Sequence, residues 1–266
     1  MVGSAHPTQM KRYKAIAAYY DAENERLDML QHDVPFFLGQ LPKKKQDILE
    51  VAVGTGRAAI PIAQAGHRVT GVDYVDDMLE IARRKRDGVG LSEKTLPLLK
   101  QDALKMDLGK KFDWICIFFN TLLAFPELED LDKLLQNVKR HLRPRGRFWL
   151  DIFNPDLTML AQSVEKNLAP AAFYVPEFNR TVYRTTDVVR DMSRQLIRCT
   201  FKYEWFDNFG TRKREKFEFD MTCIFPRELR LLLERNGLKI ERLWGNYDGV
   251  EFHDGSPRMI ARCVLA

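Results

Sequence analysis

Hydrophobic and polar positions change their period twice along this chain of 266 residues. Through residues 10–40, apolar side chains recur every three or four positions, which predicts helix. From Ile48 to Phe153, short apolar runs typical of buried strands alternate with segments of helical period. From Asn179 to Phe225 the period shortens to two residues, which predicts antiparallel strands.

The middle of the chain predicts strands and helices in strict alternation, and the end of the chain adds one helix and two strands. The expected strands are 48–53, 68–73, 96–100, 112–120, 147–153, 238–244 and 259–265. The expected helices are 57–65, 76–86, 128–142 and 226–236, with a Pro-Arg-Gly turn at 144–146. Strands joined through helices form parallel pairs with right-handed crossovers. We therefore predict an α/β fold with a Rossmann-like, seven-stranded sheet.

The segment with the two-residue period predicts an insertion in that fold. Residues 173–222 are expected to form a small antiparallel β-sheet after the fifth strand. Residues 10–172 and 223–266 then form the Rossmann-like domain, and residues 1–9 are expected to be a disordered leader. Open α/β sheets bind ligands at the carboxyl ends of their strands, where the insertion departs. We therefore expect it to cover a substrate site or to form the interface of a homodimer.

Composition narrows the class of protein. Hydrophobic residues make up 45% and charged residues 30%, which is ordinary for a globular chain. The sequence has no apolar run of membrane-helix length and no secretory signal, so we expect a cytoplasmic protein without a membrane partner. The net charge of +5 falls in short basic runs, which favours solvated surface over a nucleic-acid patch. The four cysteines are scattered, and we predict buried thiols and no metal site.

A Gly-x-Gly turn follows the first predicted strand, at Gly54 and Gly56. Glycine there lets a ligand approach the backbone closely. Together with Ala59 the turn also satisfies the dinucleotide fingerprint, which leaves a nicotinamide cofactor open. Glu50, in the apolar strand before the turn, would repel the pyrophosphate of such a cofactor. A buried acid needs a partner, either a ligand cation or a core Arg or Lys.

Asp73 ends the second predicted strand, 19 residues after Gly54. An acid at that position can accept hydrogen bonds from both hydroxyls of a ribose. It argues against a 2′-phosphate but does not distinguish between adenosine cofactors.

Five segments resemble, in order, the motifs of class I S-adenosylmethionine-dependent methyltransferases. They are Glu-Val-Ala-Val-Gly-Thr-Gly-Arg at 50–57, Gly-Val-Asp-Tyr-Val-Asp-Asp-Met-Leu at 71–79, Gln-Asp-Ala at 101–103, Phe-Asp-Trp-Ile-Cys-Ile-Phe-Phe-Asn-Thr-Leu at 112–122 and Leu-Arg-Pro-Arg-Gly-Arg-Phe at 142–148. The resemblance runs from about Tyr19 to the C-terminus, and the chain departs from the pattern at Ala52, where the family usually has its first glycine. It is similar to small-molecule members with an inserted antiparallel sheet, such as the N-methyltransferases of antibiotic sugars.

Three further segments look like recurring pieces of a broad bacterial subgroup within this class. They are residues 151–155, 247–249 and 256–258. What this subgroup methylates does not follow from the resemblance.

The resemblance implies S-adenosylmethionine as cofactor and a set of residues that hold it. These are Tyr20, Glu50, Ala52, Gly54, Gly56, Arg57, Asp73, Tyr74, Met78, Asp102, Ala103, Phe119 and Asn120. Glu50 would meet the methionyl ammonium, Asp73 the ribose, and Asp102 with Ala103 the adenine edge. Phe119 and Asn120, with Thr121, would face the transferring methyl. Core packing is an equally good interpretation of Phe119 and Met78.

The predicted reaction is in-line transfer of a methyl group to a small-molecule amine, hydroxyl or thiol. A hydroxyl would need a general base, for which Asp151, His253 and Tyr20 are unranked candidates. An NAD-dependent oxidoreductase and a non-catalytic adenosylmethionine-binding module are the alternatives from other classes. An RNA methyltransferase is disfavoured, because Asn120 is followed by Thr-Leu-Leu and not by Pro-Pro and an aromatic residue.

Overall fold

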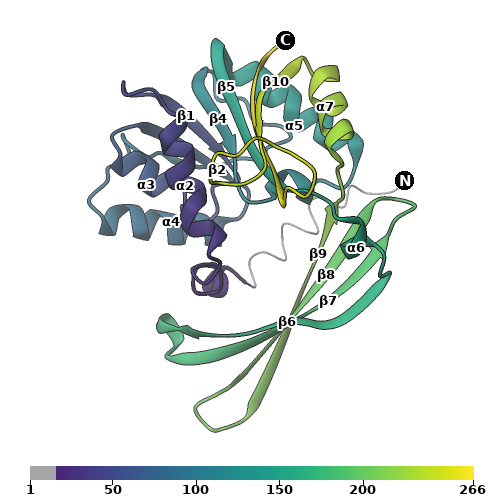
Figure 1. Ribbon diagram of the computed structural model, residues 1–266. Coiled ribbons are helices and arrows are strands. Elements are labelled where there is room, and N and C mark those ends of the chain that lie inside the picture. The colour runs from purple at the N-terminus through teal and green to yellow at the C-terminus, as the bar shows by residue number, and fades with distance from the viewer. Residues whose placement is uncertain (1–15) are drawn as a thin grey trace.

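The computed structural model describes residues 16–266 and contains two β-sheets (Figure 1). Sheet A has seven strands and sheet B four, and helices cover both faces of sheet A. The predicted α/β fold, with its seven-stranded sheet and an antiparallel insertion after the fifth strand, is confirmed. Within residues 16–266, no helix is long and apolar enough to cross a membrane.

Sheet A has the strand order β10-β11-β5-β4-β1-β2-β3. Its strands are β1 (Asp47–Val51), β2 (Arg68–Asp73), β3 (Leu98–Lys100), β4 (Phe112–Ile117), β5 (Leu142–Phe153), β10 (Leu238–Trp244) and β11 (Arg258–Leu265). The first five pair in parallel, whereas β11 is antiparallel to both β5 and β10. The carboxyl ends of β1 to β5 therefore share one edge of the sheet, which faces sheet B (Figure 1).

Two groups of helices cover sheet A. Helices α2 (Met29–Gln40), α3 (Ala59–Gln64) and α4 (Asp76–Gly88) lie on one face, and α5 (Leu128–His141) and α7 (Pro226–Arg235) on the other (Figure 1). Residues 16–24 are also helical, but residues 25–28 separate them from α2. The helical pattern predicted for residues 10–40 is thus interrupted, and its first residues lie outside the described part of the chain.

The Pro-Arg-Gly turn predicted at 144–146 is wrong. These residues lie inside β5, where pairing with β4 jumps from Phe112 opposite Leu142 to Trp114 opposite Arg147. The three extra residues are accommodated as an irregularity within the strand.

Sheet B consists of β6 (Val164–Val175), β7 (Arg180–Asp191), β8 (Leu196–Phe206) and β9 (Arg212–Thr222), all antiparallel and in sequence order. The turn predicted at 207–210 joins β8 to β9. The two-residue pattern did not predict β6, which begins ahead of residue 173. This strand lies at the sheet edge, contains Pro170, and has left-handed backbone at Asn167 and Ala169. Proline and irregular pairing are tolerated at an edge, where one side of the strand has no partner.

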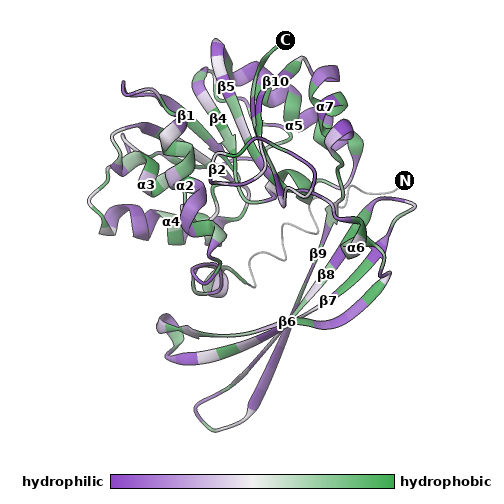
Figure 2. Cartoon of the chain, in the orientation of Figure 1, coloured by the Kyte–Doolittle hydropathy of each residue, from purple (hydrophilic) through white to green (hydrophobic). Residues whose placement is uncertain are grey.

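Two apolar clusters pack sheet B against the rest of the molecule, and the smaller one reaches Phe153, Leu160 and Phe225. The larger cluster joins residues of the 16–24 helix and the start of α4 to the inner face of sheet B. Its buried members are Ile16, Ala17, Tyr19, Val75, Met78, Phe173, Val175, Val182, Tyr203 and Phe217. Along the strands of sheet B, hydrophobic and hydrophilic residues alternate, as one buried face requires (Figure 2).

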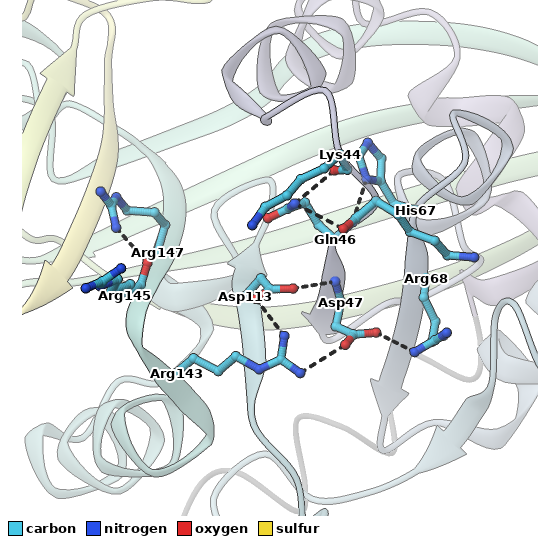
Figure 3. A network of polar contacts seen from close by, with 10 residues as sticks. Lys44, Gln46, Asp47, His67, Arg68, Asp113, Arg143, Arg145 and Arg147 are labelled. Atoms are coloured by element: carbon cyan, nitrogen blue, oxygen red, sulfur yellow. Dashed lines mark hydrogen bonds and ion pairs between the residues drawn. The ribbon is translucent and has the colours of Figure 1, made fainter.

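A polar network ties the strands of sheet A together at the edge remote from sheet B (Figure 3). Arg143 pairs with Asp113 at 2.6 Å and with Asp47 at 3.0 Å, and Asp47 also pairs with Arg68 at 2.9 Å. A cleft of about 600 Å³ opens beside this network. It lies at the amino ends of the strands, away from every predicted cofactor residue.

Candidate active site

A cavity of about 330 Å³ lies between the carboxyl ends of sheet A and the inner face of sheet B. Its floor contains residues that follow β1, β2, β3 and β4, and its wall contains residues of the 16–24 helix. The predicted residues that line it are Tyr20, Ala52, Gly54, Asp73, Tyr74, Met78, Ala103, Phe119 and Asn120. The fold thus brings together residues that are about a hundred positions apart in the sequence.

The turn after β1 forms the first part of the floor. Ala52, Gly54 and Gly56 all have left-handed backbone, with φ of 58°, 55° and 78°. For alanine, that conformation costs roughly 1–2 kcal/mol, which explains why the family usually has glycine at the position of Ala52. A Cβ on Gly54 would meet nothing within 4 Å, whereas one on Gly56 would lie 3.1 Å from Ile60. Gly54 therefore leaves room in the cavity, and Gly56 allows the following helix to pack.

Glu50 lies beneath this turn and is buried, with an exposed fraction of 3%. Its Oε2 atom has no hydrogen-bond partner among the described residues. Burial raises the pKa of Glu50 to about 8, despite the opposing effect of Arg57. Arg57 itself does not line the cavity, because its guanidinium makes two hydrogen bonds to Asp33 of α2, at 2.9 and 2.6 Å. The core cation considered as a partner for Glu50 is thus committed elsewhere.

Asp73 lies at the end of β2 and holds the floor together. One carboxylate oxygen accepts from the amide of Gly54 at 2.8 Å, and the other from the amide of Val75 at 2.9 Å. Burial raises the pKa of Asp73, and these backbone donors act in the opposite direction. Each oxygen has a second lone pair, so the carboxylate can still accept from a ligand in the cavity.

The turn after β3 contributes Gln101 and Ala103 to the cavity, but not Asp102. The carboxylate of Asp102 accepts from the amide of Leu104 at 2.9 Å, two residues further on. A local turn of this kind is a common use of aspartate. Gln101 was not predicted, although it belongs to the Gln-Asp-Ala segment.

Phe119 and Asn120 follow β4 and line the cavity in a strained conformation. Both have left-handed backbone, with φ of 51° and 60°. Two consecutive non-glycine residues of this kind cost roughly 1–2 kcal/mol each, and such strain concentrates at functional sites. The turn opens directly into the short helix η1 (Thr121–Ala124), two residues of which also line the cavity.

Sheet B supplies the opposite side of the cavity, which we call the roof. The roof residues are Arg184, Cys199, Phe201, Phe217, Phe219 and Met221. Phe217 and Phe219 stack with ring centroids 5.3 Å apart, and Phe201 meets Phe219 edge to face at 5.1 Å. The roof is therefore apolar and aromatic, with one cation.

That cation, Arg184, is paired with Glu23 in the wall of the cavity. Glu23 accepts from Arg184 at 2.6 Å and from the hydroxyl of Tyr203 at 2.8 Å. Burial raises the pKa of Glu23, and both donors oppose the shift. Glu23 lies three residues after Tyr20, on the same helical face, and this spacing was the available signal for its position. The pattern did not identify Arg184, because an alternating strand does not reveal which of its faces meets a ligand.

Of the three candidate bases, only Tyr20 lines the cavity. Burial raises the pKa of Tyr20 to about 12, so its hydroxyl is neutral at physiological pH. Asp151 is buried behind the floor, where it pairs with Arg258. His253 is exposed and hydrogen bonds to the backbone carbonyl of Asp254.

Comparison with known proteins shows which family the chain resembles. The model of a family described as methyltransferase domain matches residues 48–146. A dTDP-4-amino-2,3,4,6-tetradeoxy-D-glucose N,N-dimethyltransferase from Saccharopolyspora spinosa is 33% identical over 209 residues, which cover 77% of this chain and 76% of that protein. A cypemycin N-terminal methyltransferase from Streptomyces is 25% identical over 219 residues, covering 82% and 83% of the two chains.

Among solved structures, an S-adenosylmethionine-dependent methyltransferase from Clostridium acetobutylicum superposes with a TM-score of 0.73. The superposition covers 96% of this chain and 99% of the other, at 21% identity, and shows that the two share their fold.

The fold and the site define an enzyme of the class that binds an adenosine cofactor at the carboxyl edge of a Rossmann-like sheet. The chain belongs to the class I S-adenosylmethionine-dependent methyltransferases. This finding rules against the NAD-dependent oxidoreductase considered as an alternative.

The site fits S-adenosylmethionine on two observations of this structure. The unpartnered carboxylate oxygen of Glu50 suits an ammonium group, and the open space beside Gly54 admits a ligand against the backbone. When bound, the cofactor supplies an activated methyl group.

Proposed function

We propose that this enzyme methylates a small-molecule amine that lies between the floor and the roof of the cavity. The observation that carries the proposal is the two-sided lining of the cavity: nine of the predicted cofactor residues line one side, and an aromatic face forms the other. A site enclosed in this way limits the size of the acceptor, as expected for a small molecule.

The chain's own residues would divide the work as follows. Glu50 binds the methionyl ammonium of the cofactor and Asp73 its ribose, and the Phe119–Asn120 turn fixes the position from which the acceptor approaches. The roof excludes water and holds the apolar body of the acceptor against its rings. Orienting the two reactants at attack distance is the main contribution that a protein makes to such a displacement.

The hydrogen bonds already made by the lining carboxylates favour an amine over a hydroxyl as the acceptor. Among the described lining residues, the carboxylates are Glu23 and Asp73, and both already accept two hydrogen bonds. A neutral amine attacks without a general base, whereas a hydroxyl needs one. The relatives from Saccharopolyspora and Streptomyces are named as a dTDP-4-amino-2,3,4,6-tetradeoxy-D-glucose N,N-dimethyltransferase and a cypemycin N-terminal methyltransferase.

Two measurements test the proposal. Calorimetry should show binding of S-adenosylmethionine and S-adenosylhomocysteine, but no heat with NAD. Transfer from S-adenosylmethionine labelled on the methyl group should then be measured on matched panels of small amines, alcohols and thiols, apolar and polar. Transfer to apolar amines is expected; transfer confined to alcohols or to polyhydroxylated amines would contradict the proposed acceptor while leaving cofactor binding intact. The formation of a homodimer through sheet B stays a prediction. Sedimentation velocity tests it by measuring the oligomeric state.

A further inference from the structure

The strained Phe119–Asn120 turn is held from behind by the end of β5. The amide of Phe119 donates to Oδ2 of Asp151 at 3.1 Å, and the amide of Asn120 donates to the backbone carbonyl of Asp151 at 3.0 Å. The side chain of Asn120 in turn accepts from the amide of Phe153 at 2.8 Å. Because left-handed backbone persists only where its surroundings enforce it, these bonds are the restraint on the turn.

The second oxygen of Asp151 is bound on the other side by residues from the end of the chain. Oδ1 accepts from the guanidinium of Arg258 and from the hydroxyl of Tyr247 at 3.0 Å. Arg258 also donates to the side chain of Asn120 at 3.2 Å, and its guanidinium lies 5.5 Å from the centre of the Tyr247 ring. The side chains of Asp151 and Arg258 are 0% and 5% exposed, so water does not replace these partners.

None of these three residues lines the cavity. Their polar contacts converge on the turn, and the turn lines the cavity. A buried ion pair is a costly way to stabilise a core, since apolar residues of the same size often do so equally well. Its use here therefore calls for a role that apolar packing cannot fill.

We propose that Asp151, Tyr247 and Arg258 form a positioning unit that fixes the Phe119–Asn120 turn at the methyl-transfer site. They occupy the segments at 151–155, 247–249 and 256–258, in which the sequence assigned a role only to Asp151, as a candidate general base. The carboxylate of Asp151 is thus a positioning group and not a general base. The structural part of this inference is independent of the proposed acceptor, and only its kinetic consequence rests on the proposed function.

Amide hydrogen exchange of the whole protein with S-adenosylhomocysteine bound tests the unit directly. Tyr247→Phe keeps the ring over Arg258 but removes one bond to Asp151. We expect exchange in peptides covering residues 118–122 to become about tenfold faster, which corresponds to about 1.4 kcal/mol. Arg258→Met should accelerate it further, and Arg258→Lys should restore part of the protection. Exchange in β1 and β2 should stay unchanged.

Arg262→Met is the matched control, because Arg262 lies on the same strand but pairs with Glu241 at the surface. It should leave exchange at residues 118–122 unchanged. With any amine that supports turnover, Tyr247→Phe should lower kcat by about tenfold and change the KM for the cofactor less than threefold. Equal acceleration of exchange across sheet A would show a merely structural role. Unchanged exchange at 118–122 in Tyr247→Phe would overturn the proposal even if Arg258→Met failed to fold.

Discussion

At the scale of single residues, Glu50 shows what the sequence could and could not reveal. Its position in an apolar strand indicated a ligand, because an acid is costly to bury there. The structure places it under the glycine turn with one oxygen unpartnered. The sequence could not show that Arg57, a few residues further on, is committed to Asp33. Which cation pairs with which acid depends on the packing of α2, and this packing has no local signature.

Glu50 should release a proton when the cofactor binds. Because its pKa in the cofactor-free protein is about 8, the carboxyl is protonated at pH 6.5, and an arriving ammonium group should ionise it. Calorimetry at pH 6.5 in buffers of different ionisation enthalpy should therefore detect release of close to one proton per cofactor. Glu50→Gln should abolish the release and weaken binding by roughly ten- to hundredfold. Binding without proton release in the wild type would refute this role.

The same raised pKa predicts how pH affects the cofactor-free protein. An acid that is harder to ionise when folded stabilises the fold at low pH relative to high pH. The wild type should therefore lose stability relative to Glu50→Gln as pH rises from about 4.5 to 8, the interval between the ordinary and the raised pKa. Melting temperatures of the two proteins across this range measure the effect. Parallel curves would mean that Glu50 is not desolvated as the structure indicates.

Asp73 and Asp102 form a matched pair, because both were predicted to bind the cofactor but only Asp73 lines the cavity. Asp73→Asn should weaken cofactor binding by roughly 1.5–3 kcal/mol for each charge-assisted bond lost. Asp102→Asn should change it little, since the carboxylate of Asp102 serves its own turn. Titration calorimetry on both variants decides the matter. A larger loss of cofactor affinity with Asp102→Asn would mean that Asp102 binds the adenine.

At the scale of elements, the sequence predicted most strands of sheet A because buried parallel strands are apolar along their whole length. It missed β6, in which Pro170 and the left-handed residues Asn167 and Ala169 hide the strand pattern. It also took a Pro-Arg-Gly segment for a turn, because the three residues are typical of turns. In the fold, the three residues are an irregularity inside β5, between the pairing of Leu142 with Phe112 and that of Arg147 with Trp114.

The roof should matter for the acceptor and not for the cofactor. Phe219→Ser removes one of the stacked rings that line the cavity, so kcat/KM for an apolar amine should fall at least about tenfold, or 1.4 kcal/mol. Its control is Phe209→Ser, which makes the same substitution in the fully exposed β8–β9 turn. Cofactor dissociation constants should agree within threefold in both variants. If Phe219→Ser instead weakens cofactor binding, the roof is part of the cofactor site.

At the scale of the whole molecule, the two sheets are expected to unfold as one unit. One apolar cluster joins sheet B to α4 and the 16–24 helix, and another joins it to Phe153 of β5, so sheet B cannot open without exposing both. Calorimetry should show a single unfolding transition. S-adenosylhomocysteine at a hundred times its dissociation constant should increase the free energy of unfolding by about 2.7 kcal/mol and so raise the melting temperature of that transition. An early transition that does not respond to this ligand would show that sheet B melts alone.

The contact between Glu23 and the roof has a consequence for recombining this enzyme with its relatives. Sheet B is a continuous stretch of chain, which invites its exchange as a cassette to alter the acceptor range. Its partner in the wall, Glu23, however, lies 161 residues before Arg184 in the sequence. A chimaera that receives a foreign sheet B alone would leave Glu23 buried without Arg184 and Tyr203, an unpaired charge that is expensive to retain. The part that can be exchanged is therefore discontinuous in sequence, and residues 16–24 must be exchanged together with residues 164–222.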